Sequence, residues 1–169
     1  MLIRHAFPIL VLLGGTALAA CAKPVATVAE GTRISPEVQA TATPTLPVVL
    51  VHKSPTCGCC NQWVEHMRQA GFTVQVDNQN DVTPIKQRLG VPYGKGSCHT
   101  AEVAGYFIEG HVPAEDIKRL LVRKPDVKGL VLPGMPAGSP GMELPDGRTE
   151  PYTVEQVARD GSTQAFAQH

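Results

Sequence analysis

Four of the five cysteines are the residues whose types and spacing most directly suggest chemistry. Cys57, Cys59 and Cys60 share one Cys-Gly-Cys-Cys tetrapeptide, and Cys98 follows later in the chain. Cys57 and Cys60 have the C-x-x-C spacing of thiol oxidoreductases, and Cys59 adds a third thiol between them. At a helix start, unpaired backbone N–H groups and the helix dipole favour thiolate over thiol. Such sulfurs can bind a soft metal ion or exchange with disulfides.

The N-terminal sequence predicts that these thiols work outside the cytoplasm. Residues 1–20 have a short positive start and an apolar run too short to span a bilayer, as in a signal peptide. The run ends in Leu-Ala-Ala followed by Cys21, which resembles the lipobox of bacterial lipoproteins. We therefore expect a lipid on Cys21, a flexible tether over 21–46, and a periplasmic domain anchored to a membrane, preferably the outer one. The alternative is an ordinary secretory signal with an incidental Cys21.

In an oxidising compartment, four cysteines also fit two structural disulfides. Neighbouring Cys59 and Cys60 cannot readily pair, because vicinal geometry is strained. One possible arrangement pairs Cys57 with Cys60 and Cys59 with Cys98. The residues by themselves leave this alternative and a metal site equally open.

If the site binds metal, ligand softness favours Cu(I). Thiolates with thioether or imidazole groups suit Cu(I), zinc or iron–sulfur clusters. Zinc sites usually use two separated cysteine pairs, and only one is present here. An iron–sulfur cluster is poorly suited to an exported protein. His99, beside Cys98, and the two methionines Met135 and Met142 of the Pro-Gly-Met repeats are further candidate ligands.

The elements that must position the cysteines follow the order β-α-β-α-β-β-α. The predicted strands cover residues 47–53, 72–76 and 100–108, the last with a turn at Gly105, and the predicted helices cover 57–70, 82–89 and 113–122. This order predicts an α/β, thioredoxin-like sandwich within one domain over 47–169. In that fold the loop carrying Cys98 packs against the start of the first helix, so all four sulfurs are expected to converge.

The remaining chain is expected to form an irregular C-terminal extension. Residues 129–147 are dominated by glycine and proline, which excludes a helix there. Residues 153–164 are interpreted as a terminal amphipathic turn or helix. His66 is expected to be solvated, His111 to make local hydrogen bonds, Met67 to lie in the core, and Trp63 to pack beneath the site.

Composition excludes a general nucleic-acid-binding role. Lys and Arg total 15 and Asp and Glu total 15, so the net charge is zero, and aromatic residues make up 5%. Binding to phosphate requires clustered cations, and single-stranded nucleic acid requires aromatic stacking platforms. No nucleic-acid partner is therefore predicted.

Several sequence blocks together resemble the DUF411 family, which includes the CopG-type proteins of bacterial copper-resistance loci. The blocks are KSPTCGCC at 53–60, SCHTA at 97–101, GY at 105–106, IEGHVP at 108–113 and VLPGMP at 131–136. The resemblance extends over about 47–145. It implies a thioredoxin-like fold, a periplasmic location, and copper binding through Cys57, Cys59, Cys60 and Cys98.

The sequence therefore predicts a lipid-anchored periplasmic protein that binds Cu(I), as a single ion or a small multinuclear cluster, in copper resistance or handling. Its expected partners are copper ions and other periplasmic copper-handling proteins, and a binding role is favoured over catalysis. The alternative is a thiol–disulfide oxidoreductase with Cys57 as nucleophile and Cys60 as resolving thiol. A third possibility is a lipoprotein stapled by two disulfides.

Overall fold

The computed structural model describes residues 45–169. The predicted signal peptide, the lipidation site at Cys21 and nearly all of the predicted tether lie outside the described residues. Within the described part, each helix is too short or too polar to cross a lipid bilayer.

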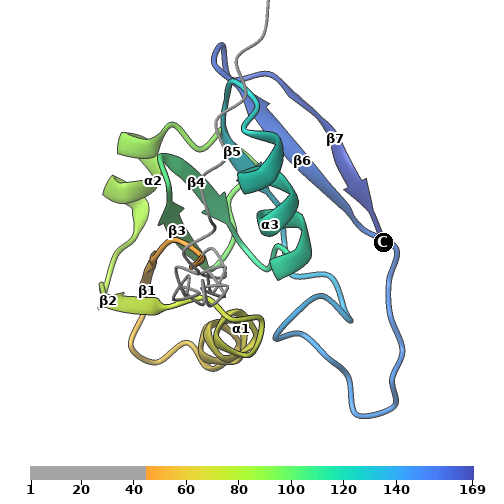
Figure 1. Ribbon diagram of the computed structural model, residues 1–169. Helices are drawn as coiled ribbons and strands as arrows, with labels where there is room; N and C mark the ends of the chain where they lie inside the picture. Colours follow the sequence, from red (N-terminus) through yellow and green to blue (C-terminus); the bar gives the residue numbers. More distant parts are fainter. Residues whose placement is uncertain (1–44) are drawn as a thin grey trace, which may run out of the picture. The chain divides into compact units, whose positions relative to one another are not determined.

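Residues 45–169 form one seven-stranded sheet with three helices (Figure 1). The helices are α1 (Gly58–Gln69), α2 (Thr83–Leu89) and α3 (Ala114–Arg123). The strands are β1 (Val49–Lys53), β2 (Val74–Asn78), β3 (His99–Val103), β4 (Tyr106–Glu109), β5 (Val127–Val131), β6 (Thr153–Ala158) and β7 (Thr163–Gln168). Their spatial order is β2-β1-β3-β4-β5-β6-β7. The pairs β1–β2 and β4–β5 are parallel, and the other neighbours are antiparallel.

The sheet separates two hydrophobic clusters because successive strand residues point to opposite faces. On β4, Ile108 belongs to the large cluster shared with α1 and α3, whereas Phe107 belongs to a small second cluster. Leu89, at the end of α2, packs against that second cluster. Thus α1 and α3 cover one face of the sheet and α2 covers part of the other.

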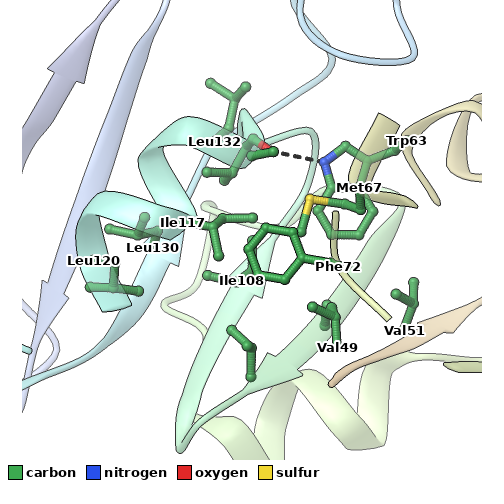
Figure 2. Close-up of a cluster of buried hydrophobic side chains, with 14 of the residues drawn as sticks. Val49, Val51, Trp63, Met67, Phe72, Ile108, Ile117, Leu120, Leu130 and Leu132 are labelled. Atoms are coloured by element: carbon green, nitrogen blue, oxygen red, sulfur yellow. Dashed lines mark hydrogen bonds between the residues drawn. The ribbon is translucent and has the colours of Figure 1, made fainter. Parts of the chain in front are cut away.

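The large cluster fixes α1, and with it the cysteine tetrapeptide, against the sheet. Trp63 and Met67 of α1 are both fully buried and pack with Ile117 of α3 and Ile108 of β4 (Figure 2). The Trp63 indole N–H donates a hydrogen bond of 2.9 Å to the Val112 carbonyl. The sequence predictions of a core position for Met67 and a position near the site for Trp63 agree with this packing.

The predicted order of elements is confirmed from β1 through α3, and the protein has a mixed α/β fold. The predicted turn at Gly105 joins β3 to β4, and the second strand begins at Val74 rather than at residue 72. The thioredoxin-like designation stays an interpretation of this order.

Residues 132–147 form the predicted irregular extension, but its first residues belong to a strand and residues 153–164 are not a helix. Strand β5 includes Gly129, where an added Cβ would lie 2.0 Å from the Phe107 carbonyl oxygen, so glycine here allows close strand approach. Residues 153–164 form β6 and the start of β7, not a helix, because β6 pairs with β5 and β7 and its Val154 and Val157 pack in clusters on opposite faces of the sheet. The Asp160-Gly161 turn, with Gly161 at φ +89°, joins the two strands.

His66 is also not solvated as predicted. Its Nε2 lies 3.1 Å from the backbone nitrogen of Ala114, so the ring accepts the N–H at the first residue of α3. Burial lowers the pKa of His66 below its ordinary value of 6.5, although Glu143 and Glu115 oppose the shift. Protonation would remove the lone pair that the Ala114 N–H requires.

We expect His66 to make folding stability sensitive to mild acid. Because the pKa is lower in the folded protein, the unfolded chain binds more protons, and the unfolding free energy falls as pH drops below about 6.5. Urea unfolding at about pH 7.5 and 5.5 checks this, with His66→Gln as the variant, since its carbonyl oxygen accepts a hydrogen bond without titrating. A pH dependence as large in His66→Gln as in the unaltered chain would contradict this assignment.

Candidate metal centre

The cysteine tetrapeptide begins α1 directly after β1 ends. Cys57 is the N-cap residue, and its Sγ accepts from the Cys60 backbone N–H at 3.4 Å. Ser54, in the connecting turn, accepts the Cys57 N–H on its carbonyl at 3.2 Å. The same carbonyl accepts from Lys53 Nζ at 2.8 Å, and the Lys53 side chain is almost completely buried. The Lys53 side chain and the Cys57 backbone N–H therefore share the Ser54 carbonyl as their acceptor.

The four cysteines that the sequence singled out come together. The Sγ atoms of Cys57, Cys59, Cys60 and Cys98 all lie within 4.8 Å of one another. Cys59 Sγ is 3.5 Å from Cys57 Sγ and 3.9 Å from Cys98 Sγ. Cys60 is fully buried, whereas the other three are partly exposed. The predicted convergence of the four sulfurs is therefore present in the fold.

The structure contains one of the two disulfides considered for these cysteines. Cys57 and Cys60 are joined, while Cys59 and Cys98 are free thiols. Burial, and secondarily the nearby Cys59, raises the pKa of the Cys98 thiol to about 11. In this state the described site thus combines one disulfide with two thiols.

Two histidines adjoin Cys98, of which the sequence predicted only His99 as a ligand. His111 Nε2 lies 3.0 Å from Cys98 Sγ, and His99 Nδ1 lies 3.5 Å from it. Cys98, His99 and His111 form a second group of potential metal donors. The hydrogen bonds of the His111 ring are not local as the sequence predicted: Nδ1 bonds the Pro140 carbonyl, 29 residues further on, and Nε2 faces the thiol.

The protonation of His111 is set by the C-terminal extension. Its Nδ1 lies 2.8 Å from the Pro140 carbonyl oxygen, which can only accept, so Nδ1 carries the proton. Nε2 then has its lone pair toward Cys98 and accepts the thiol S–H. Burial lowers the pKa of His111, which keeps the ring neutral. The ring nitrogen facing the site is therefore a potential ligand.

His99 lies beside Cys98 in the interior of the domain. Its ring is fully buried, 4.4 Å from the Trp63 ring centre, and its Nε2 has no hydrogen-bond partner within residues 45–169. Burial lowers the pKa of His99 well below its ordinary value, and nearby positive side chains such as Lys86 add to the shift. His99 is thus a neutral imidazole with one nitrogen toward Cys98.

The two methionines lie on the extension that crosses the site. Met135 follows Gly134, whose carbonyl accepts from Ser97 Oγ at 2.7 Å, and its side chain is half exposed. Met142 follows Gly141, where an added Cβ would lie 2.7 Å from the Cys59 carbonyl oxygen and 2.8 Å from the Trp63 nitrogen. Metal binding by either thioether stays a prediction.

The pairing of β3 with β4 explains why His111 lies at the site. Thr100 pairs with Glu109, and the Gly110 N–H donates to the His99 carbonyl at 3.1 Å, so the pairing continues beyond the strand ends. One further step places His111 opposite Cys98. A hairpin turn at Gly105 therefore implies this contact once the register is known.

Comparison with known proteins shows which family this chain resembles. Residues 95–142 match the family described as "Protein of unknown function, DUF411". Two solved structures of a protein described as "Copper resistance protein copG", Form 2 and Form 1, are each 44% identical in sequence and superpose with TM-scores of 0.69 and 0.68. Each comparison covers 73% of this chain and 98% of the other. The chain belongs to the DUF411 family. No curated protein sequence matches it.

The DUF411 match includes only part of the candidate metal centre. Cys98, His99 and His111 lie within residues 95–142, whereas the Cys57–Cys60 tetrapeptide precedes that range. The structural matches to copG cover a larger share of the chain than this segment. The fold and the cysteine cluster together make this site the candidate for metal binding in this member of the family.

Proposed function

We propose that the protein binds Cu(I) in the periplasm, through the sulfurs of Cys57, Cys59, Cys60 and Cys98, as part of copper resistance or handling. The observation that carries this proposal is the convergence of four sulfurs within 4.8 Å of one another. The similarity to a protein described as a copper resistance protein supports copper as the metal.

The donor set fits a soft monovalent ion. Thiolates prefer Cu(I), and sulfurs this close to each other can bridge neighbouring ions. The neutral imidazole nitrogens of His99 and His111 add two donors beside Cys98. Cu(I) binding would displace the Cys98 proton, since the ligand is the thiolate and its pKa is raised to about 11.

The oxidation state of the cysteines determines how many sulfurs can act as ligands. In the disulfide form, Cys57 and Cys60 cannot supply thiolates. Reduction by a dithiol such as dithiothreitol adds two electrons and two protons to this bond, releases two thiols and converts the reductant to its own disulfide. Full Cu(I) capacity is therefore a property of the reduced protein.

Anaerobic titration with Cu(I) tests this proposal. Protein reduced with dithiothreitol and freed of reductant should withdraw several equivalents of Cu(I) from a competing chromogenic chelator. Protein with the Cys57–Cys60 disulfide should withdraw fewer equivalents, because two of its four sulfurs are bonded to each other. Failure of the reduced protein to compete for Cu(I) would overturn the proposed function.

We further propose that a lipid on Cys21 anchors this domain to a membrane, preferably the outer membrane, where it exchanges copper with other periplasmic proteins. The Leu-Ala-Ala-Cys sequence at 18–21 supports anchoring. Cys21→Ser should move the protein from the membrane fraction to the soluble periplasmic fraction. Unchanged membrane association of that variant would refute the anchor without affecting the copper proposal.

The Cys57–Cys60 disulfide favours one second candidate function, thiol–disulfide exchange. In that reaction the Cys57 thiolate attacks a substrate disulfide, Cys60 resolves the mixed disulfide, and the substrate leaves with two thiols. Reduced, copper-free protein should then reduce insulin with dithiothreitol as the electron source. Turnover no greater than with dithiothreitol alone would eliminate this candidate.

A further inference from the structure

Glu109 is a buried carboxylate directly behind the candidate metal centre. It is the last residue of β4, pairs with Thr100 of β3, and its side chain is completely buried. Burial raises the pKa of Glu109, and the ammonium of Lys86 opposes that shift. A carboxylate in such a position needs several donors to remain in the interior.

The donors that Glu109 uses flank the Cys98-His99 dipeptide. Its Oε1 accepts the backbone N–H of Ser97 at 2.6 Å, and its Oε2 accepts from Thr100 Oγ1 at 2.6 Å. The Glu109 carboxylate thus forms hydrogen bonds to both Ser97, which precedes the dipeptide, and Thr100, which follows it.

The two residues that follow Glu109 contact the dipeptide itself. The Gly110 N–H binds the His99 carbonyl at 3.1 Å, and His111 Nε2 meets Cys98 Sγ at 3.0 Å. Gly110 also allows close approach, because an added Cβ would lie 2.7 Å from Ser97 Cβ. Residues 109–111 therefore restrain residues 97–100. Of these three residues, only Glu109 forms hydrogen bonds to both ends of the 97–100 segment.

Lys86 contacts Glu109 from α2, on the face of the sheet opposite to α1 and α3. Its Nζ donates to Glu109 Oε1 and, at 2.9 Å, to Thr100 Oγ1. The ammonium compensates the carboxylate charge that burial would otherwise disfavour. The pair thus joins α2 to the loop that carries Cys98.

We propose that Glu109 is the positioning residue for Cys98, because its carboxylate fixes the backbone on both sides of the thiol and so keeps Sγ beside Cys59 and His111. This proposal rests on the four-sulfur site of the proposed function, but it does not depend on which metal the site binds.

Alkylation of the free thiols tests the positioning role without metal. In the oxidised protein, Cys59 and Cys98 are the free thiols among the described residues, and Cys59 lies on α1, away from the Glu109 contacts. Iodoacetamide labelling followed by peptide mass spectrometry gives the rate at each thiol. Glu109→Ala should raise the ratio of the Cys98 rate to the Cys59 rate about tenfold, because the loop opens more often. Glu109→Gln, which retains one carbonyl acceptor, should give a smaller increase.

A second buried acid provides the matched control. Asp116 is also almost completely buried and pairs with Arg119 and with His169, the latter at 2.8 Å, at the start of α3. Asp116→Asn should lower the melting temperature while leaving the Cys98-to-Cys59 ratio unchanged. An equal rise of both rates in Glu109→Ala, or the same ratio change in Asp116→Asn, would reduce Glu109 to a general stabilising residue and overturn the proposal.

The copper measurement separates this proposal from the proposed function. If Glu109 positions Cys98, the reduced Glu109→Gln variant should bind Cu(I) more weakly than the unaltered chain in the chelator competition. A selective rise in Cys98 labelling in a protein that binds no Cu(I) would support the positioning role and refute copper binding. Unchanged labelling at Cys98 in both Glu109 variants would refute the positioning role whatever the copper result.

Discussion

Replacing Cys57, Cys59 and Cys60 by serine together should abolish most Cu(I) binding by the reduced protein. A serine hydroxyl is a hard donor with little affinity for Cu(I), so the variant would retain a single thiolate at Cys98 with the two imidazoles beside it. Bridging of several ions by sulfur would no longer be possible. We expect the copper-to-protein ratio, measured by elemental analysis after anaerobic loading and gel filtration, to fall from several equivalents to about one or fewer.

The triple variant should still fold, so the loss can be assigned to the ligands. The Cys57–Cys60 disulfide joins residues only three positions apart and therefore constrains little of the unfolded chain. Burying a hydroxyl at the Cys60 position costs roughly 1–3 kcal/mol. Cys21→Ser, which replaces the one cysteine that is not among the four proposed ligands, is the control and should keep full copper capacity. An unchanged copper ratio in the folded triple variant would contradict the sulfur site.

Trp63→Ala should cause the largest loss of stability among single changes near the site. The Trp63 side chain projects from α1 and is completely buried against α3 and the sheet. Truncating a buried tryptophan lowers the free energy of unfolding by about 3–5 kcal/mol. The change also removes the ring that lies 4.4 Å from His99. Urea unfolding monitored by circular dichroism measures the loss.

Two further variants separate packing from hydrogen bonding at this position. Trp63→Phe retains most of the apolar contact but leaves the Val112 carbonyl without its indole donor, which costs about 1–3 kcal/mol. Val122→Ala, at a residue whose side chain is largely exposed on α3, should change stability by about 0.5 kcal/mol or less. A Trp63→Ala loss as small as that of Val122→Ala would refute the central packing role of Trp63.

The sequence specified the elements around the cysteines because each has a strong local signal. Apolar residues at helical spacing identify α1, and the short β-branched run before it identifies β1. The position of Cys98 beside the tetrapeptide followed from the order of these elements. Each of these inferences depended on a few neighbouring residues and on one simple topology.

Other features depended on contacts between distant residues. Strand β5 was missed because Gly129 suggests a loop, and its fit against the Phe107 carbonyl becomes visible only with the partner strand in place. The approach of His111 to Cys98 requires the β3–β4 register, and the tautomer of His111 requires the Pro140 carbonyl from the extension. The role of Glu109 required a view of both ends of the Cys98 loop at once.

The Asp160-Gly161 turn is different, because its signal was present in the sequence. Asp-Gly between two short alternating runs is typical of a β-hairpin. The interpretation of 153–164 as a turn or helix gave more weight to the amphipathic pattern than to this dipeptide. Val154 and Val157 are both buried because they point to opposite faces of the sheet, where Val154 joins the large hydrophobic cluster and Val157 joins the small one.

X-ray absorption at the copper edge of reduced, anaerobically loaded protein tests the central claim most directly. This measurement identifies the atoms bound to copper without relying on a variant. If the sulfurs of Cys57, Cys59, Cys60 and Cys98 bind the metal, the first coordination shell will be dominated by sulfur and the edge will have the shape typical of Cu(I). A first shell of nitrogen and oxygen alone would contradict the four-sulfur copper site.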